Sequence, residues 1–261
     1  LTIPATIKGK PVTSIGGRAF QYCRNLTSIT IPDSVTSIES EAFWGCESLT
    51  SITIPDSVTS IGMSAFTSCF RLTSITIPDN VTSIGWHAFD NCHSLTMIEI
   101  GAGNVNYSSV DGVLFNSEKT ELIAYPKAKM GENYTVPDSV TSIGEYAFFG
   151  NISLPELLSD REVQFLESLL PESGSLSLPE HSDLTSITIP NSVTGIGREA
   201  FAYRTSLISV TFLGDPPGRL PLQVSPVFSG RANPTIYRKP EAKGWGDTWG
   251  GQPVKLISEK P

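Results

Sequence analysis

The chain has 261 residues, of which 26 are acidic and 18 are basic, so its formal net charge is −8 at pH 7. Such an acidic chain lacks the basic surface that holds a nucleic-acid backbone or an anionic membrane, so we expect neither partner. No stretch approaches the ~18 consecutive apolar residues of a transmembrane helix, which excludes membrane insertion from the expected functions.

A 23-residue repeat organises the first hundred residues. An Ala-Phe pair precedes each cysteine by three residues, and a leucine follows each cysteine at the same distance. The repeating unit reads LTSITIPDSVTSIGxxAFxxC. Repeats of this length are the signature of a solenoid, in which one structural unit stacks on the next. The four cysteines that mark the interval are Cys23, Cys46, Cys69 and Cys92.

Each unit has a simple physical interpretation. In the unit that begins at Leu26, Ile29 and Ile31 alternate with hydroxyl side chains, which predicts a half-buried strand. Pro32 ends this strand, because proline has no amide hydrogen for a sheet. A second extended piece is expected around Ile38, and the Ala-Phe-x-x-Cys segment is expected to form a short helical turn.

A single unit is too small to fold alone. Burying about six apolar side chains contributes roughly 9–18 kcal/mol at ~1.5–3 kcal/mol each. Ordering the backbone of 23 residues costs roughly 23–46 kcal/mol. Only stacking of many units produces a continuous core, so the sequence predicts an α/β repeat solenoid with parallel strands on one side and short helical or extended segments on the other.

The repeat resembles the BspA-like class of leucine-rich repeats, which is common in bacterial surface proteins. This resemblance implies an arc with a parallel sheet on its concave face and short helical or extended convex segments. It also implies a cell-surface or extracellular location and adhesion-type binding to a host or matrix protein. We assign residues 1–212 to the solenoid and residues 213–261 to a C-terminal cap.

The repeat is enlarged at residues 101–135. Ile100 and Val136 occupy equivalent positions 36 residues apart, so this unit has 13 residues more than the others. The segments 112–115 and 121–125 are expected to form a β-hairpin joined by residues 116–120. Such a segment is found in BspA-like proteins, so we interpret it as architecture in preference to a ligand-binding loop.

A second insertion covers residues 155–183 and has none of the repeat's character. Ser159 with Glu162 forms a capping box, and Pro171 follows the apolar stripe that this box precedes, which predicts one amphipathic helix. The helix either docks on its own solenoid, forms part of a degenerate repeat, enters a partner's groove, or belongs to a grafted segment. Its apolar stripe comprises Leu158, Phe165, Leu166, Leu169 and Leu170.

The end of the chain contains two tryptophans in the segment GWGDTWGG. A solenoid must cover its last open face, so atypical terminal repeats are expected. We therefore favour packing within the cap for Trp245 and Trp249 over a sugar-binding platform.

No arrangement of residues predicts catalysis, a metal or a cofactor. The positions of His87 and His93 hold unrelated residues in other repeats, so both are expected at the surface, and a zinc site with Cys92 is disfavoured. For the cysteines we favour reduced, buried thiols, because cysteine is a favoured small core residue, over disulfides between thiols stacked one repeat apart. A nucleotide-binding glycine loop and a nucleophile elbow are both missing from the sequence.

The outward positions of the first strand in each repeat are the candidate binding surface. Most of them hold serine or threonine, while Met97 and Glu99 are distinctive. The leading hypothesis is a non-enzymatic protein-binding or adhesion module, expected to be monomeric. The alternatives are a structural spacer with solvated hydroxyls and a glycan-binding face. The candidate positions are Ser28, Thr30, Ser51, Thr53, Ser74, Thr76, Met97, Glu99, Ser186 and Thr188.

Overall fold

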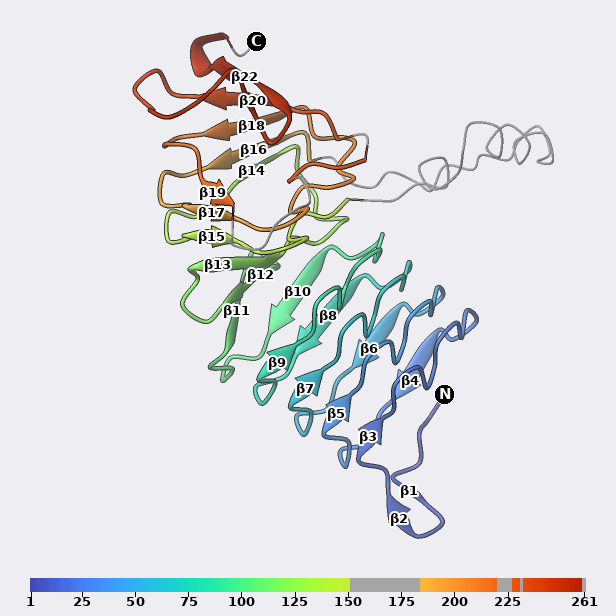
Figure 1. Ribbon diagram of the computed structural model, residues 1–261. Coiled ribbons are helices and arrows are strands. Elements are labelled where there is room, and N and C mark those ends of the chain that lie inside the picture. The colour runs from blue at the N-terminus through green and yellow to red at the C-terminus, as the bar shows by residue number, and fades with distance from the viewer. Residues whose placement is uncertain (151–183, 220–226, 231, 260–261) are drawn as a thin grey trace, which may run out of the picture.

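The computed structural model describes residues 1–150, 184–219, 227–230 and 232–259 (Figure 1). The expected helical insertion at 155–183 lies outside the described residues. This also applies to its five apolar residues, Leu158, Phe165, Leu166, Leu169 and Leu170.

Two rows of short parallel strands build the N-terminal part of the solenoid. Equivalent residues of successive repeats pair directly, as Ser28 does with Ser51 and Ser74 with Met97. A small antiparallel hairpin of β1 (Thr6–Ile7) and β2 (Lys10–Pro11) precedes them. The first row contains β4 (Ser28–Thr30), β6 (Ser51–Thr53), β8 (Ser74–Ile77) and β10 (Met97–Ile100). The second row contains β3 (Ser14–Ile15), β5 (Ser37–Ile38), β7 (Ser60–Ile61) and β9 (Ser83–Ile84).

The Ala-Phe segments are turns, so the expected short helical segments, and with them the α/β class, are not confirmed. In the described residues the only helix is a 3-10 turn at Ile257–Glu259. The residue before each Ala-Phe pair has a left-handed backbone, with φ of 60° at Glu41 and 55° at Ser64. A second left-handed residue follows, as at Gly45 with φ of 73°. A right-handed helix cannot continue through such residues.

These turns form a ladder between repeats in place of helical hydrogen bonds. The amide groups of Glu41, Phe43 and Gly45 donate to carbonyl oxygens of the next repeat at 2.8–2.9 Å. Alternate amides close four-residue turns, as Cys46 N does on Phe43 O. The Ala-Phe segment therefore acts as a third line of inter-repeat hydrogen bonding beside the two rows of strands.

Stacked phenylalanine rings fill the core of the N-terminal stack. The centroids of Phe20 and Phe43 lie 5.3 Å apart, those of Phe43 and Phe66 5.4 Å, and those of Phe66 and Phe89 6.1 Å, with nearly parallel planes. Translation by one repeat superposes identical side chains, so the rings stack like the repeats themselves. The isoleucines of both rows pack beside them in one cluster.

All four cysteines are free, and all but the exposed Cys23 are buried. Each buried thiol donates to the carbonyl oxygen of the phenylalanine in the preceding repeat, for example Cys92 Sγ to Phe66 O at 3.1 Å. Burial raises the pKa of the Cys46 and Cys92 thiols to about 12. In a later repeat Arg204 occupies the same position, and its Nε donates to Phe148 O at 2.8 Å. Arginine thus replaces cysteine as the donor to the phenylalanine carbonyl oxygen of the preceding repeat.

The enlarged repeat contains a three-stranded meander. Strands β12 (Val113–Asn116) and β13 (Glu121–Ala124) form the hairpin at the expected residues. A further strand, β11 (Tyr107–Val110), pairs antiparallel with β12 and was not expected from the sequence. Strand β13 then pairs parallel with β15 (Ser142–Ile143) and restarts the second row.

The C-terminal stack repeats the two-row arrangement. Asn133 pairs with Ser186 in the next repeat, 53 residues later, so the insertion lengthens one turn without shifting the register. Parallel pairing continues past residue 212 to the last strand of the row, and the predicted domain boundary at 212 stays a prediction. The first row contains β14 (Asn133–Thr135), β16 (Ser186–Ile189), β18 (Ser209–Phe212), β20 (Thr235–Arg238) and β22 (Gln252–Leu256). The second row contains β15, β17 (Gly195–Ile196) and β19 (Gly218–Arg219).

Aromatic side chains cover the end of the C-terminal core. The rings of Trp245 and Trp249 lie 5.1 and 5.0 Å from that of Phe212, and both tryptophans pack on the C-terminal cluster. Strand β21 (Thr248–Trp249) folds back antiparallel on β22. The prediction that both tryptophans pack within the cap is confirmed.

Candidate binding sites at the enlarged repeat

The enlarged repeat divides the solenoid into two stacks. The buried side chains form two clusters, one dominated by residues 15–98 and the other by residues 113–236. In the first row β10 pairs with β8 and β14 pairs with β16, but β10 and β14 are not paired. Figure 1 shows the strands of the N-terminal stack running obliquely to those of the C-terminal stack. We call this boundary the junction.

The ladder of Ala-Phe turns also stops at the junction. Ser64 N, Phe66 N and Ser68 N donate to the next repeat, as their equivalents do in the two earlier repeats. The equivalent amides of His87, Phe89 and Asn91 have no backbone acceptor in the part of the chain that the structure describes.

A buried lysine ties the two stacks together across this gap. Lys127 Nζ donates to Asn91 Oδ1 in the N-terminal stack at 3.0 Å and to Gly150 O in the C-terminal stack. It also lies 5.1 Å from the centroid of the Phe149 ring. Burial lowers the pKa of this ammonium group to about 8. The lysine supplies hydrogen bonds between stacks where the backbone ladder is interrupted.

A cavity of about 420 Å³ opens on the first row at the junction. Its polar side includes the Glu99 carboxylate, which accepts a hydrogen bond from Thr76 Oγ1 at 3.1 Å. Gly112, with φ of 79°, packs so closely that a Cβ there would lie 2.7 Å from Met97 Cβ. The meander therefore forms one wall and the strand β10 the floor. The lining residues are Thr76, Met97, Glu99, Ile100, Ser109, Asp111 and Gly112.

The predicted contact positions differ in exposure and in surroundings. Of the ten, Thr76, Met97 and Glu99 share the cavity at the junction. In the last full repeat the equivalent Ser209 and Thr211 are buried, with 5% and 3% exposure, so the expectation of an outward hydroxyl ladder is wrong there. Seven are exposed: Ser28, Thr30, Ser51, Thr53, Thr76, Met97 and Glu99. Three are half-buried: Ser74, Ser186 and Thr188.

Other threonines have a structural role that sequence reasoning missed. Thr59 Oγ1 donates to Thr36 O at 3.1 Å, and Thr82 Oγ1 donates to Thr59 O at 3.2 Å. The threonine before the first-row strand does the same, as Thr96 Oγ1 does with Thr73 O. The recurrence of threonine immediately before both strands in the repeats of the N-terminal stack was the signal for this hydroxyl ladder.

The prediction of a surface position is wrong for His93, while His87 is half-buried. His93 is 5% exposed and packs on the Phe70 ring at 4.9 Å. His87 Nδ1 lies 2.6 Å from Asp90 Oδ2, and its ring contacts the tilted ring of Tyr146 with the centroids 4.2 Å apart. The hydrogen bond with Asp90 raises the pKa of His87. Both positions accept varied side chains, but their neighbours at this end of the stack cover them.

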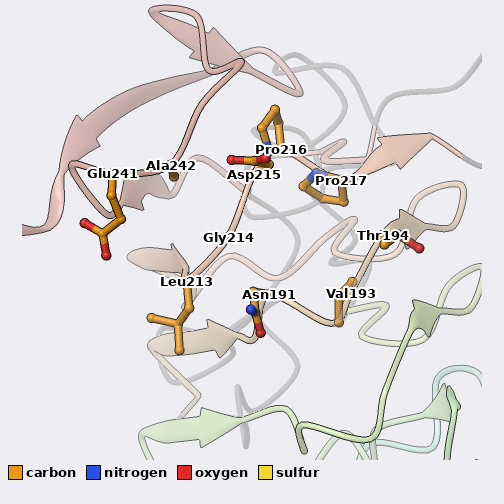
Figure 2. A pocket seen from close by; sticks show the side chains of 10 residues that line it. All are labelled: Asn191, Val193, Thr194, Leu213, Gly214, Asp215, Pro216, Pro217, Glu241 and Ala242. Atoms are coloured by element: carbon orange, nitrogen blue, oxygen red, sulfur yellow. The ribbon is translucent and has the colours of Figure 1, made fainter.

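Another cavity of about 430 Å³ lies beside the cap (Figure 2). Pro216 and Pro217 lie on one side and Asn191 and Val193 on the other. The Asp215 carboxylate accepts a hydrogen bond from Lys243 N at 2.6 Å, which joins two segments of the cap. The prolines and Asn191 are residue types that favour turns, and the Asp215 carboxylate already takes part in a structural hydrogen bond. We therefore do not choose this cavity as the candidate binding site.

The described residues contain no cluster of three or more His, Cys, Asp or Glu side chains that could hold a metal ion. Nor do they include a helix with the length and apolar character needed to cross a bilayer.

Comparison with known proteins supports the repeat assignment. No curated protein matches the chain. A leucine-rich repeat protein from Eubacterium ventriosum has 24% identity and a TM-score of 0.56 over 87% of this chain and 64% of that protein. The chain therefore spans less than two thirds of that protein's length.

Two further solved structures are similar. A leucine rich cell surface protein from Faecalibacterium prausnitzii has 23% identity and a TM-score of 0.39 over 90% of this chain and 80% of that one. A pneumococcal vaccine antigen has 20% identity and a TM-score of 0.43 over 99% of this chain and 84% of that one. The family model for the BspA type leucine-rich repeat region matches residues 5–120 and 123–215 in six copies. The chain therefore belongs to the BspA-type leucine-rich repeat family.

Proposed function

We propose that the chain is a non-enzymatic protein-binding module of a cell-surface or extracellular protein, with its contact centred on Met97 and Glu99. The observation that supports this proposal is the coincidence of two features. These residues interrupt the row of outward hydroxyls in the N-terminal stack, and they line a cavity of about 420 Å³. The extracellular location and the host or matrix partner rest on the family resemblance alone.

The chemistry of the cavity suits a protein partner. Met97 is 40% exposed, and its flexible thioether side chain can adapt to an apolar group of the partner. The cavity volume lies in the range of about 300–1,000 Å³ that is usual for binding pockets. Glu99 and Asp111 add carboxylates, which select for donors and fix orientation. Binding by a monomer is expected, because the module needs no second copy to form this surface.

The direct test restores the repeat consensus at this site. The double variant Met97→Ser with Glu99→Thr has the residues found at equivalent positions in three earlier repeats, so it should fold normally. Purified matrix and serum proteins are passed over the immobilised chain and its variants. We expect at least one protein to bind the intact chain and to lose about tenfold or more in affinity with the double variant, as for a contact at the centre of an interface.

A control and a deletion separate the alternatives. Replacing Ser51 and Thr53 with alanine should leave affinity unchanged, because these residues lie outside the cavity. Deleting residues 155–182 should also leave it unchanged, whereas loss of binding would assign recognition to the insertion. Equal binding by the double variant would contradict the proposal. Binding of a glycan panel in place of proteins would favour the glycan-binding alternative, and no binding at all would favour a structural spacer.

A further inference from the structure

A tryptophan is unusually exposed on the second row at the junction. Trp86 has 73% of its surface exposed, more than most large apolar residues of the described chain. Its position holds glycine, serine, methionine, glutamate and arginine in other repeats, so the fold does not require an aromatic ring there. Exposed tryptophans are rare on free surfaces and dominate the binding energy at protein interfaces.

Trp86 borders a groove made of two adjoining cavities. One has a volume of about 240 Å³ and the other about 80 Å³, and Ile84, Trp86, Ile123 and Glu145 line both of them. Tyr107 also lines the larger cavity, and its hydroxyl oxygen accepts the Ile84 amide hydrogen at 3.0 Å. We call this surface the Trp86 groove.

The junction is the reason that the groove exists. In a regular repeat the turn after the second-row strand is covered by the same turn of the next unit, as Ser64 N donating to Trp86 O demonstrates. At the junction β9 is the last strand of its sheet, and β11 and β13 belong to the next sheet. The amide of His87 has no backbone acceptor among the described residues. The space that a regular repeat would fill is left open between Trp86 and Ile123.

The charge at the groove is negative. Glu121 and Glu145 line the larger cavity, and Asp90 lines the smaller one. Within the described residues, neither the Glu121 nor the Glu145 carboxylate forms an ion pair. Among the described residues that line the two cavities there is no lysine or arginine, and the only basic side chain is His87, which is bonded to Asp90.

We propose that the Trp86 groove docks an arginine- or lysine-bearing segment of a partner protein. The aliphatic part of the basic side chain lies on Trp86 and Ile123, and its cationic group lies between Glu121 and Glu145. An aromatic face and carboxylates together suit a long basic side chain, because the stem is buried while the charge is attracted to both the ring and the acids. This surface is separate from the Met97 and Glu99 cavity, so the inference goes beyond the proposed function.

The test uses short peptides and the indole signals of the four tryptophans. The first peptide is an octapeptide whose two ends are capped so that they carry no charge, with a central arginine between two apolar residues. It is titrated into the full-length, ¹⁵N-labelled chain. A matched peptide has glutamine in place of arginine. We expect the arginine peptide to shift the Trp86 indole signal, with little effect on those of Trp44, Trp245 and Trp249. The glutamine peptide should leave all four signals in place.

Two variants and one control define the chemistry. Trp86→Ser places the Ser40 residue type at this position and should abolish peptide binding. Glu145→Gln should weaken binding by about fivefold, the effect of one exposed ion pair of about 1 kcal/mol. Glu118→Gln changes the net charge equally but lies outside the groove, so affinity should not change.

Three results would overturn the proposal. The first is that the arginine peptide leaves Trp86 unperturbed at millimolar concentration. The second is that the glutamine peptide binds equally well, which would make the groove an apolar site without charge selection. The third is concentration-dependent self-association in sedimentation velocity that is lost in Trp86→Ser, which would identify a second copy of the chain as the occupant.

Discussion

The two stacks use the same repeat with different degrees of regularity. In the N-terminal stack the rings of Phe43 and Phe66 are inclined by 1°, whereas in the C-terminal stack those of Phe148 and Phe201 are inclined by 26°. The second stack also contains Arg204 in the position of the buried cysteines. Both stacks nevertheless keep the same pairing of strands and Ala-Phe turns. The comparison teaches that backbone ladders set the register and that side-chain identity sets only how evenly the core packs.

The largest effect is expected from a charge in the regular stack. Ile75 is 1% exposed, so Ile75→Asp places an unpaired carboxylate in the core. This should cost several kcal/mol and lower the melting temperature by about 10 °C or more. Thermal unfolding followed by circular dichroism measures the loss, and Ile75→Val should cost only about 1 kcal/mol. A melting temperature within a degree or two of the parent would show that Ile75 is not in the core.

A matched pair of phenylalanines compares the middle of a stack with its end. Phe66 stacks on rings at both sides, whereas Phe89 stacks on Phe66 alone and is 9% exposed. Phe66→Ala should lower the free energy of unfolding by about 3–5 kcal/mol. Phe89→Ala should cost less, since its ring loses fewer contacts. Urea denaturation of both variants measures the difference, and an equal loss would mean that the core is continuous across the junction.

At alkaline pH the buried cysteines of the first stack and the lysine at the junction should have opposite effects on the free energy of unfolding. Burial raises the pKa of the Cys46 and Cys92 thiols from 9.0 to about 12, so their contribution to stability is present below pH 9 and is lost as the pH rises. Each thiol should then lower the free energy of unfolding by about 1 kcal/mol per pH unit. Lys127 acts in the opposite direction between pH 8 and 10.5, because burial lowers its pKa to about 8.

Urea denaturation between pH 8 and 10 under reducing conditions tests this balance. Cys92→Ala should flatten the decline in stability, and Lys127→Met should steepen it. Cys23→Ala is the control, because Cys23 is exposed. A pH profile that none of the three variants alters would contradict the assigned burial of these groups.

The smallest effect is expected from the hydroxyl ladder. Thr59→Val removes the hydrogen bond to Thr36 O at the surface and should cost about 0.5–1 kcal/mol. Thr53→Val is the control, because the Thr53 hydroxyl forms no hydrogen bond with another described residue and both side chains suit a strand. Thermal unfolding of the two variants should therefore differ. Equal stabilities would mean that the threonine ladder does not contribute.

Much of the architecture could be predicted from the sequence. The interval of 23 residues identified the solenoid and the pairing partners, and alternation around Ile29 and Ile31 identified the buried face of the first-row strand. The Ala-Phe turns could not be read correctly. Left-handed backbone conformations are usually predicted from glycine, but here they occur at other residues, such as Glu41 and Ser64.

The junction was only partly predictable. The hairpin was visible as two apolar segments, but β11 was missed because Tyr107–Val110 has two consecutive serines and no alternation of apolar and polar residues. The interrupted pattern of hydroxyls marked Met97 and Glu99 as distinctive positions, but it did not predict the cavity that they line. The Trp86 groove could not be predicted, because it depends on which strands fail to pair, and this is set by the path of the 13 extra residues.

Amide hydrogen exchange is the most direct test of the junction on which both proposed surfaces depend. The amides of His87 and Phe89 should be protected about 100-fold less than those of Ser64 and Phe66, which donate to the next repeat. The two pairs occupy equivalent positions one repeat apart, so each serves as the reference for the other. Equal protection of the two pairs would show that the ladder continues across the junction and would contradict the account.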